Sequence, residues 1–223
     1  MHLDCAAFLA RACAVFALLT LGLLPAEAAE PPLVPLNQVL EELRQGGLVI
    51  YLRHTATDTS PASSNPEDSA NCETQRKLSP QGHNDAVLIG KAIKALRIPI
   101  DKVIAGPYCR TRDTAQLAFG SYVTNPDLAF VLGTDIKETQ RRAEALRRLL
   151  ATPPAPGSNT VLISHSANLF EAAGIFAKPE GAAYVFRPQA EGRFVPLARV
   201  LPEDWGEVAR ISPAAGRSRA SPQ

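Results

Sequence analysis

Apolar residues follow two different spacings along this chain, and the two alternate from residue 33 to residue 202. Unbroken apolar runs predict strands that are buried on both faces of a sheet, whereas apolar residues three and four positions apart predict helices. The predicted strands are residues 47–54, 100–107, 127–133 (the weakest of them) and 160–166, with a closing pair at 182–188 and 193–202. The predicted helices are residues 33–46, 79–98, 108–120, 137–151 and 167–176.

This alternation of strands and helices predicts a fold class. Parallel strands need long connections, usually helices, so the pattern favours an α/β fold with three layers: a largely parallel sheet with helices on both faces. Ser79 and Pro80 suit the cap and the first position of a helix, and Gly46 and Gly47 suit a helix end. The sequence shows no internal repeat, so we expect one domain over residues 29–223.

The first residues differ from this pattern. Arg11 precedes an apolar run over residues 12–24, and Ala26 and Ala28 then provide small residues two positions apart. This arrangement is typical of a signal peptide, so residues 1–28 are predicted to be cleaved off and the protein to be periplasmic or secreted. The alternative is an N-terminal anchor that stays uncleaved. We expect no transmembrane span after signal removal, because no later apolar run is long enough.

Charge and cysteine content indicate which binding partners and which compartment to expect. The formal net charge is only +1, and the basic residues are scattered except on the helix at residues 141–148, so the sequence gives no sign of a nucleic-acid-binding face. Signal removal would leave Cys72 and Cys109 as the only cysteines. In an oxidising compartment we expect them to form a disulfide, the alternative being two buried free thiols.

Polar side chains follow three of the predicted strands. Arg53 and His54 come at the end of the first strand, and His165 comes at the end of the fourth. Arg110 lies four residues beyond Gly106, where the second strand ends. Because parallel sheets bind ligands at the carboxyl ends of their strands, we expect these side chains to converge. Two guanidinium groups and two imidazoles without a metal-ligand spacing indicate an oxyanion site, most naturally one for phosphate.

In order along the chain, these motifs resemble those of the histidine phosphatase superfamily, which has the phosphoglycerate-mutase-like fold. The family signature is an Arg-His-Gly-x-Thr stretch, a Leu-Ser/Thr-x-x-Gly helix start, a Ser-Pro-x-x-Arg-x-x-x-Thr-Ala stretch and a second histidine. The matching stretches are "LRHTAT" with Thr57, "KLSPQG", "GPYCRTRDTA" with Arg110, Thr114 and Ala115, and "LISHSANL" with His165. Two positions depart from the family: Thr55 replaces glycine and Gly106 replaces serine.

The resemblance implies a mechanism and roles for residues. His54 would be the nucleophile that forms a phosphohistidine, with Arg53, Arg110 and His165 holding the phosphate oxygens. No metal or other cofactor is implied. Thr57, Gln75 and Arg76 are candidates for substrate binding, although a polar loop explains Gln75 and Arg76 equally well. His83, near the start of a helix, is interpreted as a surface residue.

The family usually supplies an acidic residue that protonates the leaving group, often about 25 residues beyond the second arginine. Asp135 and Glu138 fit this distance here. We prefer Asp135, because it follows a predicted strand end, whereas Glu138 lies in the first turn of a helix, where the helix dipole alone explains an acid. Glu171 and Glu180 are further alternatives.

These observations predict an exported phosphomonoesterase. A phosphoglycerate mutase fits less well, because such an enzyme works in the cytosol. The alternative from another class is a phospho-ligand-binding module of the same fold without turnover, in which Thr55 or a missing proton donor prevents the reaction. The substrate would be a small-molecule or lipopolysaccharide-type phosphomonoester, and the sequence does not select among sugar phosphates, phosphorylated heptose and other envelope phosphoesters.

Overall fold

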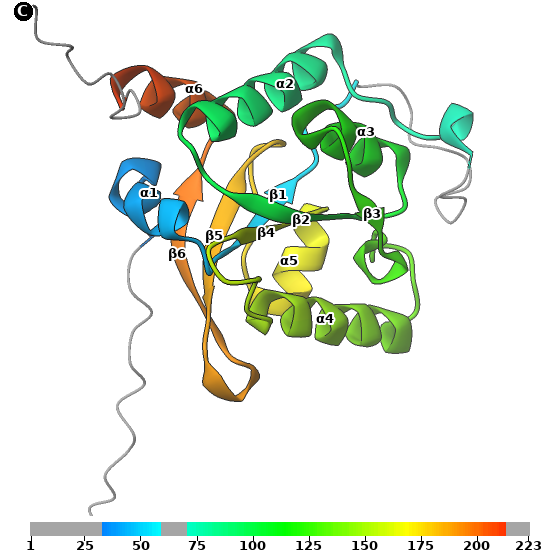
Figure 1. Cartoon of the computed structure of the whole chain (residues 1–223). Helices are drawn as coiled ribbons and strands as arrows, with labels where there is room; N and C mark the ends of the chain where they lie inside the picture. The colour runs from blue at the N-terminus through cyan, green and yellow to red at the C-terminus, as the bar shows by residue number, and fades with distance from the viewer. Residues whose placement is uncertain (1–32, 59–70, 213–223) are drawn as a thin grey trace, which may run out of the picture. The chain divides into compact units, whose positions relative to one another are not determined.

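The computed structural model describes residues 33–58 and 71–212, which form a six-stranded sheet with helices on both faces (Figure 1). The strands are β1 (Val49–Arg53), β2 (Ile100–Ala105), β3 (Val123–Thr124), β4 (Asn159–Ser164), β5 (Ala183–Pro188) and β6 (Phe194–Val200). The helices are α1 (Leu36–Gln45), α2 (Pro80–Ala95), α3 (Cys109–Phe119), α4 (Ile136–Ala151), α5 (Ser166–Ala173) and α6 (Pro202–Ile211).

The sheet has the strand order β3-β2-β4-β1-β5-β6. The four strands from β3 to β1 are parallel to one another, while β5 and β6 run antiparallel beside β1. The α/β class, the largely parallel sheet and the closing pair of strands are therefore confirmed. Within the described part of the chain, no helix is both long and apolar enough to cross a membrane. The predicted signal peptide, residues 1–28, lies outside the described residues.

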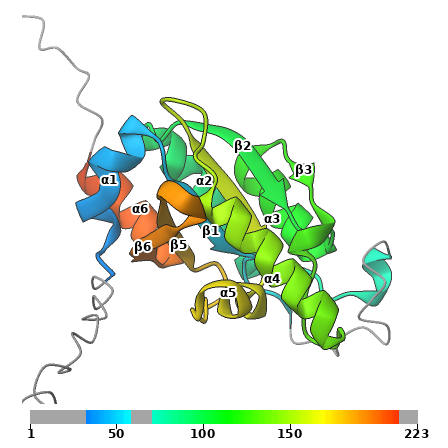
Figure 2. The ribbon, with the colours of Figure 1, turned by 90° about the horizontal axis from the view of Figure 1, so that it is seen from below.

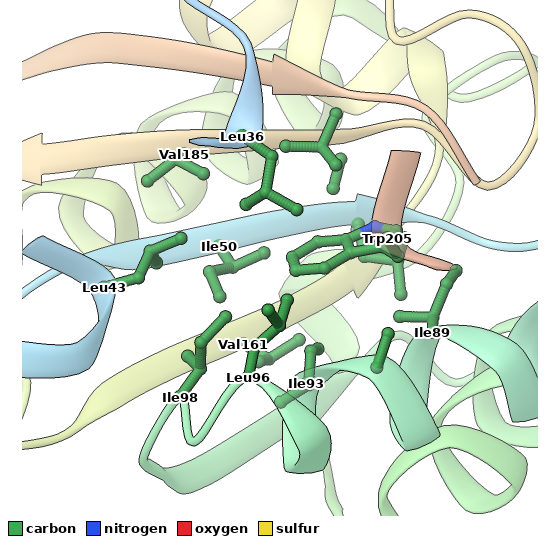
Figure 3. Packing of buried hydrophobic residues seen from close by; sticks show 14 of the residues in the cluster. Leu36, Leu43, Ile50, Ile89, Ile93, Leu96, Ile98, Val161, Val185 and Trp205 are labelled. Atoms are coloured by element: carbon green, nitrogen blue, oxygen red, sulfur yellow. The ribbon is translucent and has the colours of Figure 1, made fainter. Parts of the chain in front are cut away.

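Strand β1 shows why a central strand of this sheet is an unbroken apolar run. Ile50 and Leu52 pack into a core with α1, α2 and α6, where Trp205 is fully buried (Figure 3). Val49 and Tyr51 belong to a second core on the opposite face, with residues of α4 and α5. Figure 2 shows these two helices side by side. Since successive side chains of a strand face opposite sides, a strand that is covered twice must be apolar at every position.

The start of α2 is fixed against the loop that leaves β1. The Ser79 side chain caps the helix by accepting from the Gly82 amide at 3.1 Å, and the Ser79 amide donates to the Ala56 carbonyl at 2.9 Å. Gly82 packs so closely on the Ala56 backbone that a Cβ there would overlap it. Glycine at this position therefore lets α2 approach the residues that follow His54.

Two elements differ from the sequence prediction. The predicted strand at residues 127–133 is wrong: Pro126–Leu128 forms a 3-10 helix, and the third parallel strand is Val123–Thr124. Three of its apolar residues are explained by burial rather than by strand pairing, since Leu128, Ala129 and Val131 are in the core. The sequence analysis also missed α6, although Pro202 in the first turn and Asp204, which accepts from the Leu201 amide at 2.7 Å, are recognisable start signals.

Candidate active site

The carboxyl ends of the three central parallel strands meet at one cavity of about 320 Å³. The His54 amide, just after β1, donates to the Ser164 carbonyl at the end of β4 at 3.0 Å. The Gly106 amide, just after β2, donates to the Ile163 carbonyl at 2.9 Å, which aligns the third strand end. The cavity is lined by the four residues expected to converge: Arg53, His54, Arg110 and His165.

The His54 imidazole is held in one tautomer. Its Nδ1 lies 3.0 Å from the Thr55 carbonyl oxygen, which can only accept, so Nδ1 carries the proton. The Nε2 atom then bears a lone pair, on a side chain that lines the cavity. This is the protonation state of an imidazole that can act as a nucleophile.

His165 is held in the opposite tautomer. An Arg110 guanidinium nitrogen lies 3.4 Å from His165 Nδ1, and because guanidinium groups only donate, Nδ1 accepts and Nε2 carries the proton. The Tyr51 hydroxyl donates to the His165 carbonyl at 2.7 Å and so holds the backbone. Among the described residues, His165 Nε2 is buried and has no hydrogen-bond partner. The two rings, with centroids 5.3 Å apart, thus combine a nucleophile with a donor that an anion can satisfy.

Burial and positive charge keep both imidazoles neutral. Removal from water, and next to it the charge of Arg110, lower the pKa of His54 and of His165 well below the ordinary value of 6.5. Burial also lowers the pKa of Arg110 to about 10, so this group still carries its charge at neutral pH. The site therefore presents charged guanidinium groups together with uncharged rings, as nucleophilic attack on a phosphate requires.

This arrangement predicts the behaviour of the rings in acid. Since the pKa values of His54 and His165 in the folded protein lie below 6.5, both rings should stay neutral through pH 6 and become protonated only in more acidic solution. Histidine NMR titration with assignment by single His→Asn variants measures this directly. A midpoint at or above 6.5 for either ring would contradict the electrostatic account of the site.

Glu180 contacts three other residues of the site: Arg53, Arg76 and Thr57. Its carboxylate lies 3.1 Å from an Arg53 guanidinium nitrogen and 3.3 Å from one of Arg76. It also accepts from the Thr57 amide at 2.8 Å and from the Thr57 hydroxyl, to which Arg76 donates as well. Arg76 and Glu180 line the cavity, whereas Thr57 contacts Glu180 from outside the lining. Each arginine also has a buried Nε without a partner among the described residues.

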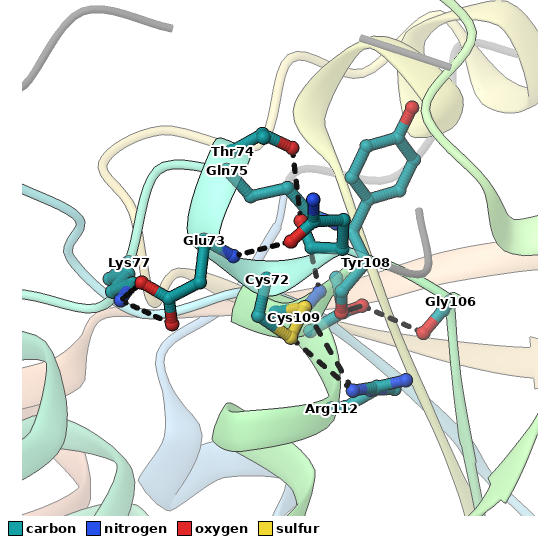
Figure 4. Close-up of a disulfide and its surroundings, with 11 residues drawn as sticks. Cys72, Glu73, Thr74, Gln75, Lys77, Gly106, Tyr108, Cys109 and Arg112 are labelled. Carbon is teal, nitrogen blue, oxygen red and sulfur yellow. Dashed lines mark hydrogen bonds and ion pairs between the residues drawn. A yellow bond between two sulfur atoms is a disulfide. The ribbon is translucent and has the colours of Figure 1, made fainter. Parts of the chain in front are cut away.

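Gln75 is buried but does not line the cavity. Its side-chain oxygen accepts from the Cys109 amide at 2.9 Å, at the start of α3 (Figure 4). The disulfide between Cys72 and Cys109, with Cα atoms 5.6 Å apart, joins the same two segments. The expected bridge is therefore present in the structure. Through these two links, the segment before α2 is attached to the residue that precedes Arg110.

The two departures from the family motif have local explanations. Thr55 is fully buried, and its hydroxyl lies 3.2 Å from the Thr114 hydroxyl, so its side chain is not among those lining the cavity. Gly106 lies against the Leu128 carbonyl oxygen, which would be only 2.5 Å from a Cβ at this position. A serine there would require the segment containing Leu128 to move.

The sequence-predicted proton donor lies away from His54. Asp135 caps α4 by accepting from the Lys137 and Glu138 amides at 2.8 Å and 3.0 Å. It lines a neighbouring cavity of about 420 Å³, which shares only its wall of Tyr108, Phe130 and Leu132 with the His54 cavity.

Two of the alternative donors are also outside the His54 cavity. Hydrogen bonds from Arg141 and Arg142 lower the pKa of Glu138 to about 2. Glu171 is exposed and does not line the cavity. Of the described carboxylates, only Glu180 lines the cavity together with His54.

The aromatic residues around the site were not predicted from the sequence. Tyr108 and Phe130 place their rings 5.4 Å and 4.9 Å from the His165 ring, and Arg110 lies over Tyr108 at 4.7 Å. Tyr108 could have been found from its place beside Arg110, whereas Phe130 lay in the segment predicted as a strand. No group of three or more metal-binding side chains occurs among the described residues, and the positive lining suits an anion.

No protein-family model matches the sequence, and no curated protein is significantly similar to it. Solved structures do resemble the chain. One is a phosphoserine phosphatase variant from Entamoeba histolytica in complex with phosphoserine, with a TM-score of 0.51 and 14% sequence identity. The alignment covers 70% of this chain and 98% of the phosphatase chain. A candidate alpha-ribazole-5'-P phosphatase from Escherichia coli K-12 has a TM-score of 0.51 at 12% identity, covering 69% and 95%.

A third structure is the protein histidine phosphatase SixA complexed with tungstate. It has a TM-score of 0.49 at 16% identity and covers 70% of this chain and 98% of its own. Identities this low establish the architecture rather than the activity. The chain has the phosphoglycerate-mutase-like α/β fold, with a six-stranded, mostly parallel sheet.

Proposed function

We propose that this protein is an exported phosphomonoesterase that acts through a phosphohistidine intermediate on His54. The observation that carries the proposal is the pairing of tautomers in one cavity: a lone pair on His54 Nε2 and a donor on His165 Nε2, flanked by Arg53 and Arg110. A phosphate that occupied this cavity would satisfy the unpartnered His165 Nε2 and Arg53 Nε atoms. The fold is one that phosphatases use.

The reaction follows from this geometry in two steps. The His54 Nε2 lone pair attacks phosphorus while the bond from phosphorus to the ester oxygen breaks, and that oxygen takes up a proton as the alcohol leaves. Water then attacks phosphorus and gives a proton back to the group that protonated the alcohol, the nitrogen–phosphorus bond breaks, and the lone pair returns to Nε2. Arg53, Arg110 and His165 stabilise the charge on the other phosphate oxygens in both steps.

One assay tests the proposed activity. Purified protein should release p-nitrophenol from p-nitrophenyl phosphate across a range of pH values with EDTA present, and inorganic phosphate should inhibit competitively. Phosphate binding without any turnover would support the phospho-ligand-binding module instead. Absence of both binding and turnover would contradict the proposal altogether.

We assign the role of proton donor to Glu180 rather than to Asp135, because Glu180 alone among the described acids lines the cavity with His54. A carboxyl group on the same lining as the attacking imidazole is placed where a proton can be passed to the leaving oxygen.

Two isosteric variants distinguish these donors. Glu180→Gln should slow hydrolysis of an alkyl phosphate about a hundredfold and that of p-nitrophenyl phosphate less than about tenfold, because only the alkoxide needs a proton. Asp135→Asn is the matched control, since asparagine caps a helix as well as aspartate does, and both rates should stay unchanged. If Asp135→Asn instead slowed only the hydrolysis of the alkyl phosphate, Asp135 would be the donor. If Glu180→Gln slowed the hydrolysis of both substrates equally, Glu180 would have a positioning role.

Export is proposed on two grounds: the signal-like pattern of residues 1–28 and the Cys72–Cys109 disulfide, a bond that persists in oxidising compartments. N-terminal sequencing of protein from the cell-envelope or secreted fraction should find a mature start near Ala29. Cytoplasmic protein that retains Met1 would contradict export and leave the proposed reaction unaffected.

A further inference from the structure

The cavity that contains His54 has two chemically different halves. Its inner half carries the charged and imidazole groups around the phosphate position. Its outer half is formed by carbon surfaces, with Leu132 from the segment before α4 and Phe176 from the segment after α5. These two side chains are exposed to 61% and 51%, although each is large and apolar. Large exposed apolar groups at the mouth of a cavity mark a binding surface.

The apolar half continues directly from the phosphate position. Phe130 contacts His165, with ring centroids 4.9 Å apart, and Arg110 lies 5.6 Å from the centre of the same ring. Leu132 follows two residues later along the same segment, and Ala167 in the first turn of α5 adds a methyl group. A group attached to the bound phosphate would therefore meet carbon atoms as it leaves the inner half.

Phe176 is held in place rather than left to move freely. Its ring stacks on that of Phe170 with centroids 4.1 Å apart and an angle of 20° between the planes. The Lys178 ammonium group lies 5.5 Å from the centre of the Phe176 ring. A ring fixed in this way can contact another ring through the part that stays exposed, edge to face, without a large loss of side-chain entropy.

We infer that the leaving group of the substrate carries an aromatic ring, which packs between Leu132 and Phe176 while the phosphate lies on Arg53, Arg110 and His165. This rests on the proposed function and narrows its substrate class. A sugar would need several hydrogen-bond partners for its hydroxyl groups. Besides the groups around the phosphate position, the described lining instead offers mainly carbon, with the Tyr108 hydroxyl, the buried Ser166 hydroxyl and the Lys178 ammonium group as its polar groups.

Non-hydrolysable phosphonates test this inference by binding alone. Benzylphosphonate and methylphosphonate share the same anionic group and differ by a phenyl ring. The ratio of their dissociation constants therefore measures how much contact of the phenyl ring with the outer half of the cavity contributes to binding. Isothermal titration calorimetry should show benzylphosphonate binding about tenfold more tightly to the unchanged protein, as expected for burial of part of a ring. In Leu132→Ala and in Phe176→Ala the preference should fall below about threefold, with the methylphosphonate affinity unchanged.

Ile211→Ala is the control, because Ile211 is exposed to 67% yet lies at the end of α6, away from the cavity lining. It should keep the full preference for benzylphosphonate. Equal affinities for the two phosphonates in the unchanged protein would overturn the inference, as would a preference that survives in both Leu132→Ala and Phe176→Ala. If neither phosphonate binds, the phosphate site itself is absent and the proposed function fails with the inference.

Discussion

A His54→Ala variant should hydrolyse p-nitrophenyl phosphate at least about a thousandfold more slowly than the unchanged protein, because it lacks the nitrogen that we propose attacks phosphorus. The phosphoenzyme should disappear with it. Brief incubation of unchanged protein with a ³²P-labelled substrate, followed by alkaline denaturation, should retain label that acid removes, as expected for a phosphoramidate. His54→Ala should retain none.

The chain provides a matched control for this variant. His83 is an exposed histidine in the first turns of α2 and does not line the cavity, so His83→Ala should keep both turnover and label. Circular dichroism and thermal unfolding would show that His54→Ala still folds. Near-full activity or an acid-labile phosphoenzyme in folded His54→Ala would show that another residue is the nucleophile.

Arg110→Ala should have a different signature. Removing this guanidinium group should weaken competitive inhibition by phosphate and also lower the rate of hydrolysis. Arg110 would contact both bound inorganic phosphate and the phosphoryl group in the transition state. It also removes the donor that lies 3.4 Å from His165 Nδ1. A loss of rate with unchanged phosphate affinity would place the contribution of Arg110 in the transition state alone.

The convergence of Arg53, His54, Arg110 and His165 was predictable because parallel strands deliver their ends to one edge of the sheet. Glu180 was harder to place, since it lies in a loop between α5 and β5 that carries no motif. Its position depends on which loops pack over the strand ends, and that is a property of the tertiary structure. From the sequence, Glu180 could therefore be named only as one of four candidate proton donors.

Asp135 illustrates a signal with two meanings. An aspartate after a turn, followed three residues later by Glu138, is the usual pattern at the start of a helix, and in the structure Asp135 caps α4. The prediction that this residue faces the crevice depended on a preceding strand at residues 127–133. The 3-10 helix Pro126–Leu128 overlaps the start of that segment, and the predicted strand does not form. The geometric reason for preferring Asp135 therefore no longer holds.

The second large effect concerns the bridge between Cys72 and Cys109. Replacing both residues with serine should lower the free energy of unfolding by up to about 4 kcal/mol, because the bridge closes a 37-residue separation and restricts the unfolded chain. Urea denaturation monitored by tryptophan fluorescence measures this difference, since Trp205 is fully buried in the core. Reduced, unchanged protein should unfold at nearly the same urea concentration as the variant.

Removing the bridge should also weaken the proposed phosphate site. Cys109 precedes Arg110, and the covalent bond supplements the hydrogen bond from its amide to the Gln75 side chain. Without the bridge, the hydrogen bond to Gln75 remains, but no covalent bond between Cys72 and Cys109 holds the start of α3 to the segment before α2. Competitive inhibition by phosphate should therefore weaken several-fold in the double serine variant, under conditions where the protein remains folded.

Gln75→Ala separates the two links, because it removes the hydrogen bond and leaves the disulfide intact. It should cost about 1 kcal/mol in unfolding free energy, well below the effect of removing the bridge. Mass spectrometry of alkylated, unreduced protein from its native compartment should detect Cys72 and Cys109 as one linked peptide pair. Two alkylated thiols there, or an unfolding free energy that is unchanged in the double serine variant, would show that the bridge does not stabilise the working protein.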